Sequence, residues 1–432
     1  MSENTCMNAK VNLAAADAET TRAVGPSCRF CGHSLQVTFI DLGMSPPCQT
    51  HIEPHQLNHM EPFYPLHAWV CERCFLVQLE EYVTPGNIFS EYAYFSSFAD
   101  SWVEHARKYS VHMRERFGLG PGSLVMEIAS NDGYLLQHFV AQGVPVLGIE
   151  PAANVAKVAQ DKGVRTEVCF HGRSSADKIV AKYGLADLLL GNNVLAHVPD
   201  LNDFVAGMKR LLKRGGVITM EFPHLQRLME QNQFDTIYHE HFSYFSFLTV
   251  EQVFAAHGLV LFDVEELPTH GGSIRIYARH AEDHSKAVGE RPQQLRAREL
   301  ALGFDRLQTY QNFDEQVKST KRKILSLLIE LRNRGKTIVG YGAPGKGNTL
   351  LNYCGIRTDL LDYTVDRNPY KQGKYTPGTH IPILSPERIR DTRPDYVFIL
   401  PWNLKDEICA QLSYVRDWGG RFIVPIPEPQ VL

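Results

Sequence analysis

Residues 123–133 read SLVMEIASNDG, and this stretch decides the fold. Its apolar first half, residues 123–128, predicts a buried strand, and the polar turn at residues 129–133 is expected to lead into a helix near Tyr134. The next apolar run, VPVLGIE at residues 144–150, predicts a second strand that ends in an acid, Glu150. A strand, a tight turn, a helix and a second strand in this order are typical of a parallel sheet covered by helices.

The same alternation continues along the chain. Residues 187–193 (DLLLGNN) and 217–222 (VITMEF) predict two further strands, and the amphipathic segment 200–213 predicts a helix between them. We therefore expect the middle of the chain to be a doubly wound α/β domain with a parallel sheet. Ligands of such sheets bind beyond the carboxyl ends of the strands.

The turn after the first strand lacks the G-x-G-x-x-G of dinucleotide-binding folds. From Glu127 it reads E-I-A-S-N-D-G, which resembles the first motif of class I S-adenosylmethionine-dependent methyltransferases, with Ala129 where that pattern commonly has glycine. Glu150 is placed to accept hydrogen bonds from both hydroxyls of a ribose, which fits NAD as well as S-adenosylmethionine. The candidate cofactor-binding residues of this region are Glu127, Ser130, Asn131, Asp132, Gly133 and Glu150.

Length and composition set the outer limits. A chain of 432 residues is expected to form two or three domains. Its net charge of −4 argues against nucleic acid or an acidic membrane surface as a partner. No apolar run approaches the roughly 18 residues of a membrane span, and the first 25 residues lack the pattern of a secretory signal and predict a flexible tail. A cytoplasmic protein is expected.

Two C-x-x-C turns near the front predict a metal site. Residues 28–31 and 71–74 each place two thiolates on one point, and two such turns supply the tetrahedral sulfur set that Zn²⁺ favours. A filled shell of four cysteines leaves no open position, so this zinc is expected to be structural. The alternative is four buried or redox-active cysteines. The predicted ligands are Cys28, Cys31, Cys71 and Cys74.

A second glycine-rich loop follows the predicted strand at residues 336–341. From Gly340 it reads G-Y-G-A-P-G, with Lys346 next and Asp366 about 20 residues on, as in a dinucleotide-binding fold. Gly347 stands where a phosphate-binding P-loop has serine or threonine, so a nucleotide-hydrolase site is rejected. Backbone N–H groups at a helix start can equally hold the phosphates of a nucleotide-linked substrate, and Lys346 adds charge. A purely packing role for this second Rossmann-like domain is the remaining alternative.

The stretch YHEHFSYFS at residues 238–246 indicates chemistry. Its two histidines are two residues apart, which does not match the H-E-x-x-H zinc helix, so metal binding is the weaker interpretation. Proton transfer is the stronger one, because imidazole titrates near neutral pH. Methylation of a carbon requires that a proton first leave a carbon beside a carbonyl, and donors must then hold the enolate. Tyrosine hydroxyls and a second histidine suit that task.

Five motifs taken together resemble one family. They are the C-x-x-C pair, YAYFSS at 92–97, GNNVLAHV at 191–198, YHEHFSYF at 238–245 and the Gly-rich loop at 340–348. In this order they resemble the zinc-containing sugar C-methyltransferases of deoxysugar biosynthesis, over about residues 26–432. The resemblance implies S-adenosylmethionine as methyl donor and a nucleotide-linked 4-ketosugar, methylated at C-3, as substrate.

The resemblance also implies roles for single residues. His241 is similar to the base that removes the C-3 proton, and Glu240 to the acid that orients the base or a sugar hydroxyl. The groups around the ketone and enolate are implied to be Tyr238, His197 and either Tyr92 or Tyr94. Asn193 is similar to a residue near the methyl donor. The implied substrate-binding residues are Gly342, Gly345, Lys346, Asn348 and Tyr244.

The expected organisation has four parts. A tail (1–25) precedes a zinc-binding domain (26–88), a methyltransferase domain (89–285) and a C-terminal Rossmann-like domain (286–432) that holds the nucleotide sugar. A monomer is expected. Two other functions stay open: an NAD-linked oxidoreductase or epimerase that uses the loop at 340–345, and a zinc-containing binding module that has lost catalysis.

Overall fold

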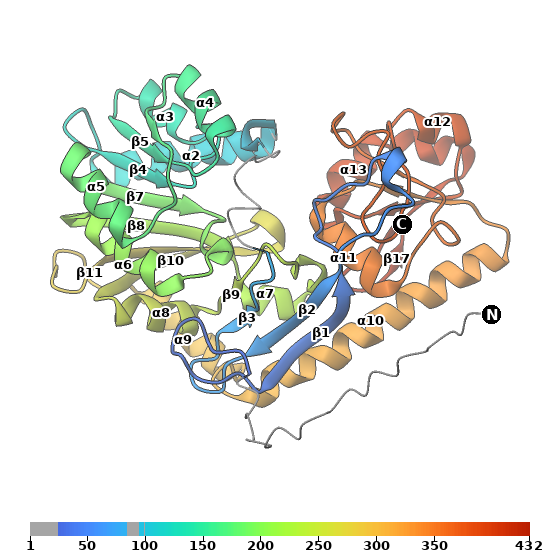
Figure 1. Cartoon of the computed structure of the whole chain (residues 1–432), viewed down its shortest axis with the longest axis horizontal. Coiled ribbons are helices and arrows are strands. Elements are labelled where there is room, and N and C mark those ends of the chain that lie inside the picture. The colour runs from blue at the N-terminus through green and yellow to red at the C-terminus, as the bar shows by residue number, and fades with distance from the viewer. Residues whose placement is uncertain (1–24, 84–94, 99) are drawn as a thin grey trace, which may run out of the picture.

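The computed structural model describes residues 25–83, 95–98 and 100–432, so Tyr92 and Tyr94 lie outside the described residues. Three sheets organise the protein (Figure 1). We refer to residues 25–83 as the N-terminal lobe, to residues 100–285 as the middle lobe and to residues 286–432 as the C-terminal lobe.

The N-terminal lobe is built on an antiparallel sheet of β1 (Val37–Ser45), β2 (Tyr64–Val70) and β3 (Val77–Leu79). Its fourth strand, β9 (Ser243–Tyr244), comes from the middle lobe and pairs Tyr244 with Val77. The sequence analysis did not foresee this exchange. It matters because the 238–242 segment runs directly into β9 and is therefore held by the N-terminal sheet.

The middle lobe confirms the doubly wound α/β prediction. Its seven-stranded sheet has the order β10-β11-β8-β7-β4-β5-β6. Its strands are β4 (Val125–Ile128), β5 (Val146–Ile149), β6 (Thr166–Glu167), β7 (Ala186–Asn192), β8 (Leu212–Pro223), β10 (Leu259–Leu267) and β11 (Ser273–His280). Its helices are α2 (Asp100–Phe117), α3 (Leu136–Ala141), α4 (Ala153–Asp161), α5 (Arg173–Tyr183), α6 (Leu201–Leu211), α7 (Leu225–Glu230) and α8 (Phe247–Ala256).

One strand departs from the predicted parallel sheet. β11 lies antiparallel between β8 and β10. The reason is local: only residues 268–272 join β10 to β11, and so short a connection can link only antiparallel neighbours. The carboxyl ends of β4, β5, β7 and β8 still meet at one edge, as the ligand-site prediction requires.

The C-terminal lobe carries a second, smaller sheet with the order β14-β13-β12-β15-β16-β17. Its pairs are parallel except for β16 with β17. Its strands are β12 (Ile338–Tyr341), β13 (Thr364–Val365), β14 (Ile383–Leu384), β15 (Tyr396–Ile399), β16 (Arg421–Val424) and β17 (Gln430–Val431). Its helices are α9 (Glu290–Ala301), α10 (Leu307–Asn333), α11 (Gly345–Cys354), α12 (Arg388–Thr392) and α13 (Lys405–Gln411).

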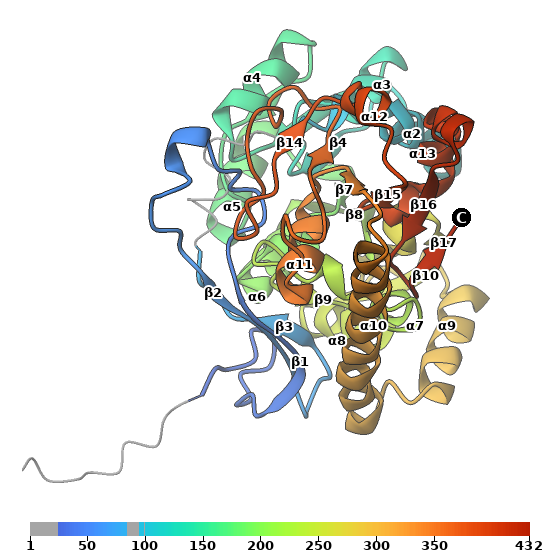
Figure 2. The ribbon, with the colours of Figure 1, turned by 90° about the vertical axis from the view of Figure 1, so that its right-hand side faces the viewer.

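The N-terminal lobe shares its core with both neighbours. Phe39 of β1 stacks on Phe313 of α10, with ring centroids 4.9 Å apart and ring planes at 13°. In Figure 2, α10 stands beside the N-terminal sheet. On the other side, Cys71 and Cys74 belong to the same buried cluster as Phe247 of α8. The N-terminal lobe therefore fixes the middle and C-terminal lobes relative to each other.

Among the helices of the described ranges, none combines the length and the apolar character needed to cross a lipid bilayer.

Candidate active site

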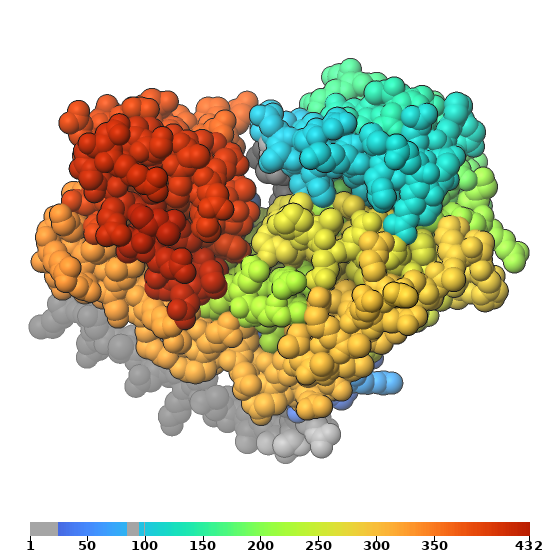
Figure 3. All heavy atoms as spheres, turned by 180° about the vertical axis from the view of Figure 1, so that it is seen from behind, coloured from blue at the N-terminus to red at the C-terminus, as the bar shows by residue number. Residues whose placement is uncertain are grey.

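A cavity of about 580 Å³ brings the predicted site residues together. Its walls come from all three lobes, and Figure 3 shows the notch that separates the C-terminal lobe from the middle lobe on the back of the molecule. Of the predicted residues, the cavity is lined by Asn131, Glu150, Asn193, His197, Tyr238, Glu240, His241, Gly345 and Lys346. Residues predicted to bind cofactor and residues predicted to bind sugar thus share one space.

The turn after β4 forms the cofactor side of the cavity. The backbone N–H groups of Asn131 and Ala152 each donate to the Glu150 carboxylate at 2.9 Å, so that side chain is fixed at the cavity wall. A carboxylate offers about four acceptor positions, and two remain for a ligand. Ala129 has a φ of +55°, a conformation in which glycine is favoured. This explains why the methyltransferase pattern commonly has glycine there.

Buried polar atoms below the cavity fit a cationic ligand. Within residues 25–83, 95–98 and 100–432, both carboxylate oxygens of Glu127, both polar side-chain atoms of Asn192 and Oδ1 of Asn193 have no hydrogen-bond partner. Burial, and then the charges of Glu150 and Asp132, raise the pKa of Glu127 well above its ordinary value. A ligand with an ammonium group and a sulfonium supplies the missing donors and positive charge, so these residues fit S-adenosylmethionine.

Three of the predicted cofactor-binding residues, Ser130, Asp132 and Gly133, do not line the cavity but support the turn after β4. Asp132 pairs with Lys162 at 3.1 Å. Gly133 has a φ of +75°, and a Cβ added there would meet Val164 at 3.0 Å. Ser130 is fully buried beneath the turn.

His241 lines the same cavity. Its Nδ1 lies 2.9 Å from the carbonyl oxygen of Thr236, which can only accept, so Nδ1 carries the proton and Nε2 is the basic nitrogen. Burial, together with the neighbouring His197, lowers the pKa of His241 well below its ordinary value. The ring is therefore neutral at physiological pH, which a proton acceptor must be.

Aromatic and imidazole rings surround this base. The Tyr238 and His197 ring centroids lie 4.0 Å and 4.7 Å from that of His241. His197 donates from Nδ1 to the carbonyl oxygen of Glu240 at 2.7 Å, and burial lowers its pKa to about 4. Tyr244 lies behind His241, at a centroid distance of 6.1 Å, and does not line the cavity.

The 238–242 segment is neither a strand nor a helix. Residues 239–240 form a turn, closed by the hydrogen bond from His241 N to Tyr238 O at 2.9 Å. Phe242 N then donates to Ala196 O at 2.7 Å, which ties this turn to the segment that carries His197. The turn explains how Tyr238, Glu240 and His241 all reach one cavity although their spacing fits no regular element.

The C-terminal lobe closes the cavity with the start of α11. Gly345 and Lys346 line it, and the Lys346 ammonium lies 4.4 Å from the centroid of the Trp402 ring. Burial lowers the pKa of Lys346 to about 8, opposed by the charge of Asp235. Gly342 and Asn348 do not line the cavity; Asn348 instead donates to the carbonyl oxygen of Cys48 at 2.6 Å.

The acid predicted to hold a ribose in a dinucleotide fold does not line the cavity. Asp366 accepts hydrogen bonds from the backbone N–H groups of Ala343 and Asn368, both at 2.8 Å, and so holds the Gly-rich loop. The side chain of Cys48 lies at the start of α11, where a Cβ on Gly345 would meet its sulfur at 2.9 Å.

Several cavity residues were missed from the sequence. Trp102, His270 and Gln49 line the cavity, and Cys48 touches Glu240 at its edge. His270 is a non-glycine residue with a φ of +55°, and its ring lies 5.0 Å from that of Trp102. The His-Gly-Gly run at 270–272 was a usable signal for a strained turn; Gln49 and Cys48 gave none, because a loop of another lobe carries them.

The four predicted zinc ligands meet at one point. Their sulfur atoms all lie within 4.8 Å of one another, and three of the four residues are buried. The Gln78 side-chain amide donates to Cys28 Sγ at 3.2 Å, which is the outer contact expected of a thiolate ligand. This donor set fits a tetrahedral Zn²⁺ with no open position.

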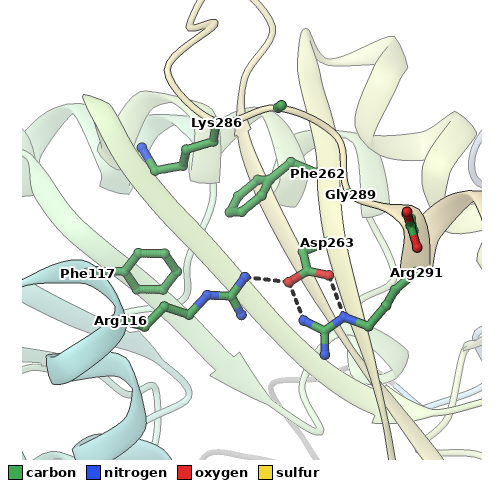
Figure 4. Close-up of a pocket in the computed structure, with 9 residues that line it drawn as sticks. Arg116, Phe117, Phe262, Asp263, Lys286, Gly289 and Arg291 are labelled. Atoms are coloured by element: carbon green, nitrogen blue, oxygen red, sulfur yellow. Dashed lines mark hydrogen bonds and ion pairs between the residues drawn. The ribbon is translucent and has the colours of Figure 1, made fainter.

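A second hollow, of about 510 Å³, lies between α2, β10 and the start of α9. Arg116 and Arg291 both pair with Asp263 there (Figure 4). Lys286 donates to Gly215 O at 2.7 Å. These four charged side chains thus have partners within the protein.

Comparisons with known proteins agree with this geometry. Residues 28–89 match a family model described as "Putative zinc binding domain", residues 102–264 match a methyltransferase domain, and residues 268–427 match a C-methyltransferase C-terminal domain. The C-methyltransferase NovU of Streptomyces niveus is 38% identical over 408 residues, which are 94% of this chain and 96% of that protein. The chain belongs to the C-methyltransferase family.

More distant similarities are confined to the middle lobe or to parts of the chain. A ubiquinone biosynthesis O-methyltransferase of Bartonella bacilliformis is 27% identical over 108 residues, 24% of this chain and 44% of that protein. The CcbJ methyltransferase of Streptomyces caelestis is 11% identical, covers 41% of this chain and 89% of that one, and has a TM-score of 0.33. As a C-methyltransferase, the chain is an S-adenosylmethionine-dependent enzyme with a class I methyltransferase fold in its middle lobe.

Proposed function

We propose that this C-methyltransferase methylates C-3 of a nucleotide-linked 4-keto-deoxysugar. One observation carries the proposal: a single cavity holds a neutral imidazole with a basic Nε2, a cofactor wall and the start of a helix with a lysine. Carbon methylation needs the first two, and a substrate phosphate needs the third. The match over nearly the whole chain to a C-methyltransferase supports the reaction class.

In this proposal, His241 is the base. The 4-keto group acidifies the C-3 hydrogen, Nε2 of His241 takes that proton, and the electron pair of the broken C–H bond moves into the enolate. Tyr238, whose ring packs against that of His241, is placed to donate to the enolate oxygen. His197 lies beside them, but its single N–H already donates to the carbonyl oxygen of Glu240, so its Nε2 can only accept. Bound S-adenosylmethionine supplies an electrophilic methyl group. The residues proposed to hold it are Glu127, Asn131, Glu150, Asn192 and Asn193.

The nucleotide end is assigned to the C-terminal lobe. Gly345 and Lys346 at the start of α11 line the cavity, and the Lys346 ammonium, which donates to Oδ1 of Asn403, has further N–H groups for a phosphate. With a pKa of about 8, Lys346 stays largely protonated at neutral pH and can pair with a phosphate. The structural zinc holds the N-terminal lobe, which in turn fixes the 238–242 segment.

Two rival functions predict other results. An NAD-linked oxidoreductase must bind NADH at the 340–345 loop, yet neither Gly342 of this loop nor Asp366 lines the cavity. A binding module without catalysis tolerates changes at Tyr238, Glu240 and His241. Calorimetric titration with S-adenosylhomocysteine and with NADH separates them: we expect micromolar binding of the first alone.

The substrate test uses a panel of nucleotide 4-ketosugars with methyl donor, followed by mass spectrometry. The proposal expects one product heavier by one methyl group. A second arm omits the donor and uses D₂O with S-adenosylhomocysteine: His241 should exchange the C-3 hydrogen for deuterium. Deuterium incorporation without methylation still identifies the enolate step, whereas neither reaction with any ketosugar would contradict the proposal.

A further inference from the structure

A loop of the N-terminal lobe reaches into the active site. Residues 46–53, which follow β1 and which we call the strap, lie against the C-terminal lobe (Figures 1 and 2). Ile52 and Tyr375 exchange two backbone hydrogen bonds of 2.9 and 2.8 Å, and Glu53 pairs with Lys374 at 2.9 Å. Near the cavity, Asn348 of α11 donates to the carbonyl oxygen of Cys48 at 2.6 Å. The strap is therefore fixed at both of its ends.

This anchoring places Cys48 against the acid of the proposed mechanism. The Cys48 thiol is buried, and its sulfur lies 3.7 Å from Oε1 of Glu240, within the range of an S–H···O hydrogen bond. The sulfur also fills the space beside Gly345. One thiol thus contacts the 239–240 turn of the middle lobe and the start of α11 in the C-terminal lobe.

The hydrogen bond from Cys48 to Glu240 is weak, although a buried carboxyl is expected to be held by strong donors. A buried carboxylate is ordinarily held by hydrogen-bond donors. In the described parts of the chain, Cys48 is the sole residue whose side chain donates a hydrogen bond to the Glu240 carboxyl. A thiol is a weak donor. Burial, followed by the charge of Glu240, raises the pKa of Cys48 well above its ordinary value, so the thiol keeps its proton and donates. The other titratable groups around this pair are His197, His241, Tyr238, Tyr244, Lys346, Lys371 and Asp235.

We propose that Cys48 is a positioning residue: its thiol donates to the Glu240 carboxyl, holds that carboxyl toward the cavity, and couples the protonation of the carboxyl to this hydrogen bond. The catalytic meaning of this role rests on the proposed function, in which Glu240 orients the base or a sugar hydroxyl. The Cys48–Glu240 coupling itself needs no substrate.

The causes of the Glu240 pKa shift predict the direction in which each Cys48 variant should move that pKa. Burial raises the pKa of Glu240 to about 7, and the hydrogen bond from Cys48 lowers it. Serine is isosteric but a stronger donor, so Cys48→Ser should lower the pH at which Glu240 titrates. Cys48→Ala removes the donor and should raise it. Each shift is expected to be about half a pH unit to one unit. A merely space-filling cysteine gives no such opposite pair of shifts.

Infrared spectroscopy of the full-length protein tests the coupling. The Glu240 carboxyl band is identified as the band lost in Glu240→Gln, and its intensity is followed from pH 5 to 9. The imidazoles of His197 and His241, with strongly lowered pKa values, stay neutral over this range. The Cys48 S–H band, identified by its loss in Cys48→Ala, should move to lower frequency as Glu240 ionises, because a carboxylate is the stronger acceptor. This movement should be absent in Glu240→Gln.

Each outcome of these measurements either supports the inference or overturns it. Opposite shifts of the carboxyl midpoint in the serine and alanine variants, with a pH-dependent S–H band, support the inference. A Cys48 S–H band that does not respond to pH in the otherwise unchanged protein overturns it, whether or not the variants fold. Neither readout uses a sugar. Failure of every ketosugar assay would therefore not affect the evidence for the coupling. Likewise, methylation of a ketosugar would not be evidence for a coupling that infrared spectroscopy fails to detect.

Discussion

His239 and His241 are two residues apart, yet their rings lie in different environments. His241 lines the cavity and donates from Nδ1 to Thr236 O, whereas Nε2 of His239 lies 3.2 Å from the carbonyl oxygen of Pro65 in the N-terminal lobe. The turn at residues 239–240 separates them. One histidine is placed for chemistry and the other ties the turn to its neighbour.

This difference supplies a matched pair of variants. His241→Asn keeps a polar side chain but loses the basic nitrogen, and we expect kcat to fall by about 10²- to 10⁴-fold. Calorimetric affinity for S-adenosylhomocysteine should change less than twofold, because His241 is not among the residues proposed to hold the cofactor. His239→Asn should retain most of the activity. A comparable loss of cofactor affinity in His241→Asn would contradict its role as base.

The cofactor wall is tested at the end of β5. Glu150→Gln removes the charge that the amides of Asn131 and Ala152 orient, and affinity for S-adenosylhomocysteine should fall by about 10- to 100-fold. The matched control is Glu167→Gln at the end of the neighbouring β6. Glu167 pairs with Lys182 at 2.5 Å and does not line the cavity, so its variant should bind normally. Equal losses in both variants would indicate general disturbance of this sheet edge.

The sequence predicted those features of the fold and the site that depend on patterns in consecutive residues. Apolar runs placed β4, β5, β7 and β8 within a few residues, and the C-x-x-C spacing brought four sulfurs together, because both signals are written in consecutive residues. The turn holding Tyr238, Glu240 and His241 was not predicted, since it is set by Phe242 bonding to Ala196 and by β9 joining another lobe's sheet. Such pairings join segments that are distant in the sequence, so no periodic pattern of residues predicts them.

The same limit applies to individual site residues. Cys48 and Gln49 look like ordinary loop residues until the strap is seen against α11, 300 positions along the chain. Asp366, by contrast, has the right spacing for a ribose acid, yet it does not line the cavity. Spacing shows which residues could meet a ligand; the three-dimensional structure decides whether they lie beside its site.

The cysteine cluster should be needed for folding stability. Cys71→Ser should abolish binding of one zinc ion per chain, measured by elemental analysis, and lower the melting temperature strongly, because Cys71 lies in the buried cluster that joins the N-terminal and middle lobes. A structural zinc contributes on the order of several kcal/mol or more to folding. Cys409→Ser on α13 is the control and should keep both zinc and stability. A zinc-free protein that melts like the wild type would refute the structural role.

The charge cluster of the second hollow should serve stability alone. Asp263→Ala leaves Arg116 and Arg291 without their shared carboxylate, which should cost about 1–3 kcal/mol of unfolding free energy in urea. Asp177→Ala breaks the exposed pair with Arg210 and should cost less than about 0.5 kcal/mol. Methyl transfer should be unchanged in both at a temperature where both are folded. A selective loss of activity in Asp263→Ala would show that this hollow takes part in function.

A buried carboxyl beneath Lys346 should make stability depend on pH. Asp235 is fully buried, and the indole N–H of Trp402 donates to its Oδ2 at 2.7 Å. Burial raises the pKa of Asp235 from 3.8 to about 6, so the folded protein holds this proton more tightly than the unfolded chain does. The stabilisation is fully present below pH 3.8 and is lost as the pH rises through about 6. Asp235→Asn cannot ionise, so the wild type should lose up to about 3 kcal/mol relative to this variant between pH 4 and 7.

The measurement is the difference in unfolding free energy between wild type and Asp235→Asn, from urea titrations at half-unit steps of pH. The opposite sign is expected for Asp395→Asn: burial works against ionisation of Asp395, but hydrogen bonds from Thr337 and Lys336 lower its pKa overall, so the wild type loses its advantage as the pH falls. Parallel curves for wild type and Asp235→Asn across this range would mean that Asp235 is ionised in the folded protein throughout, stabilised by the Lys346 ammonium.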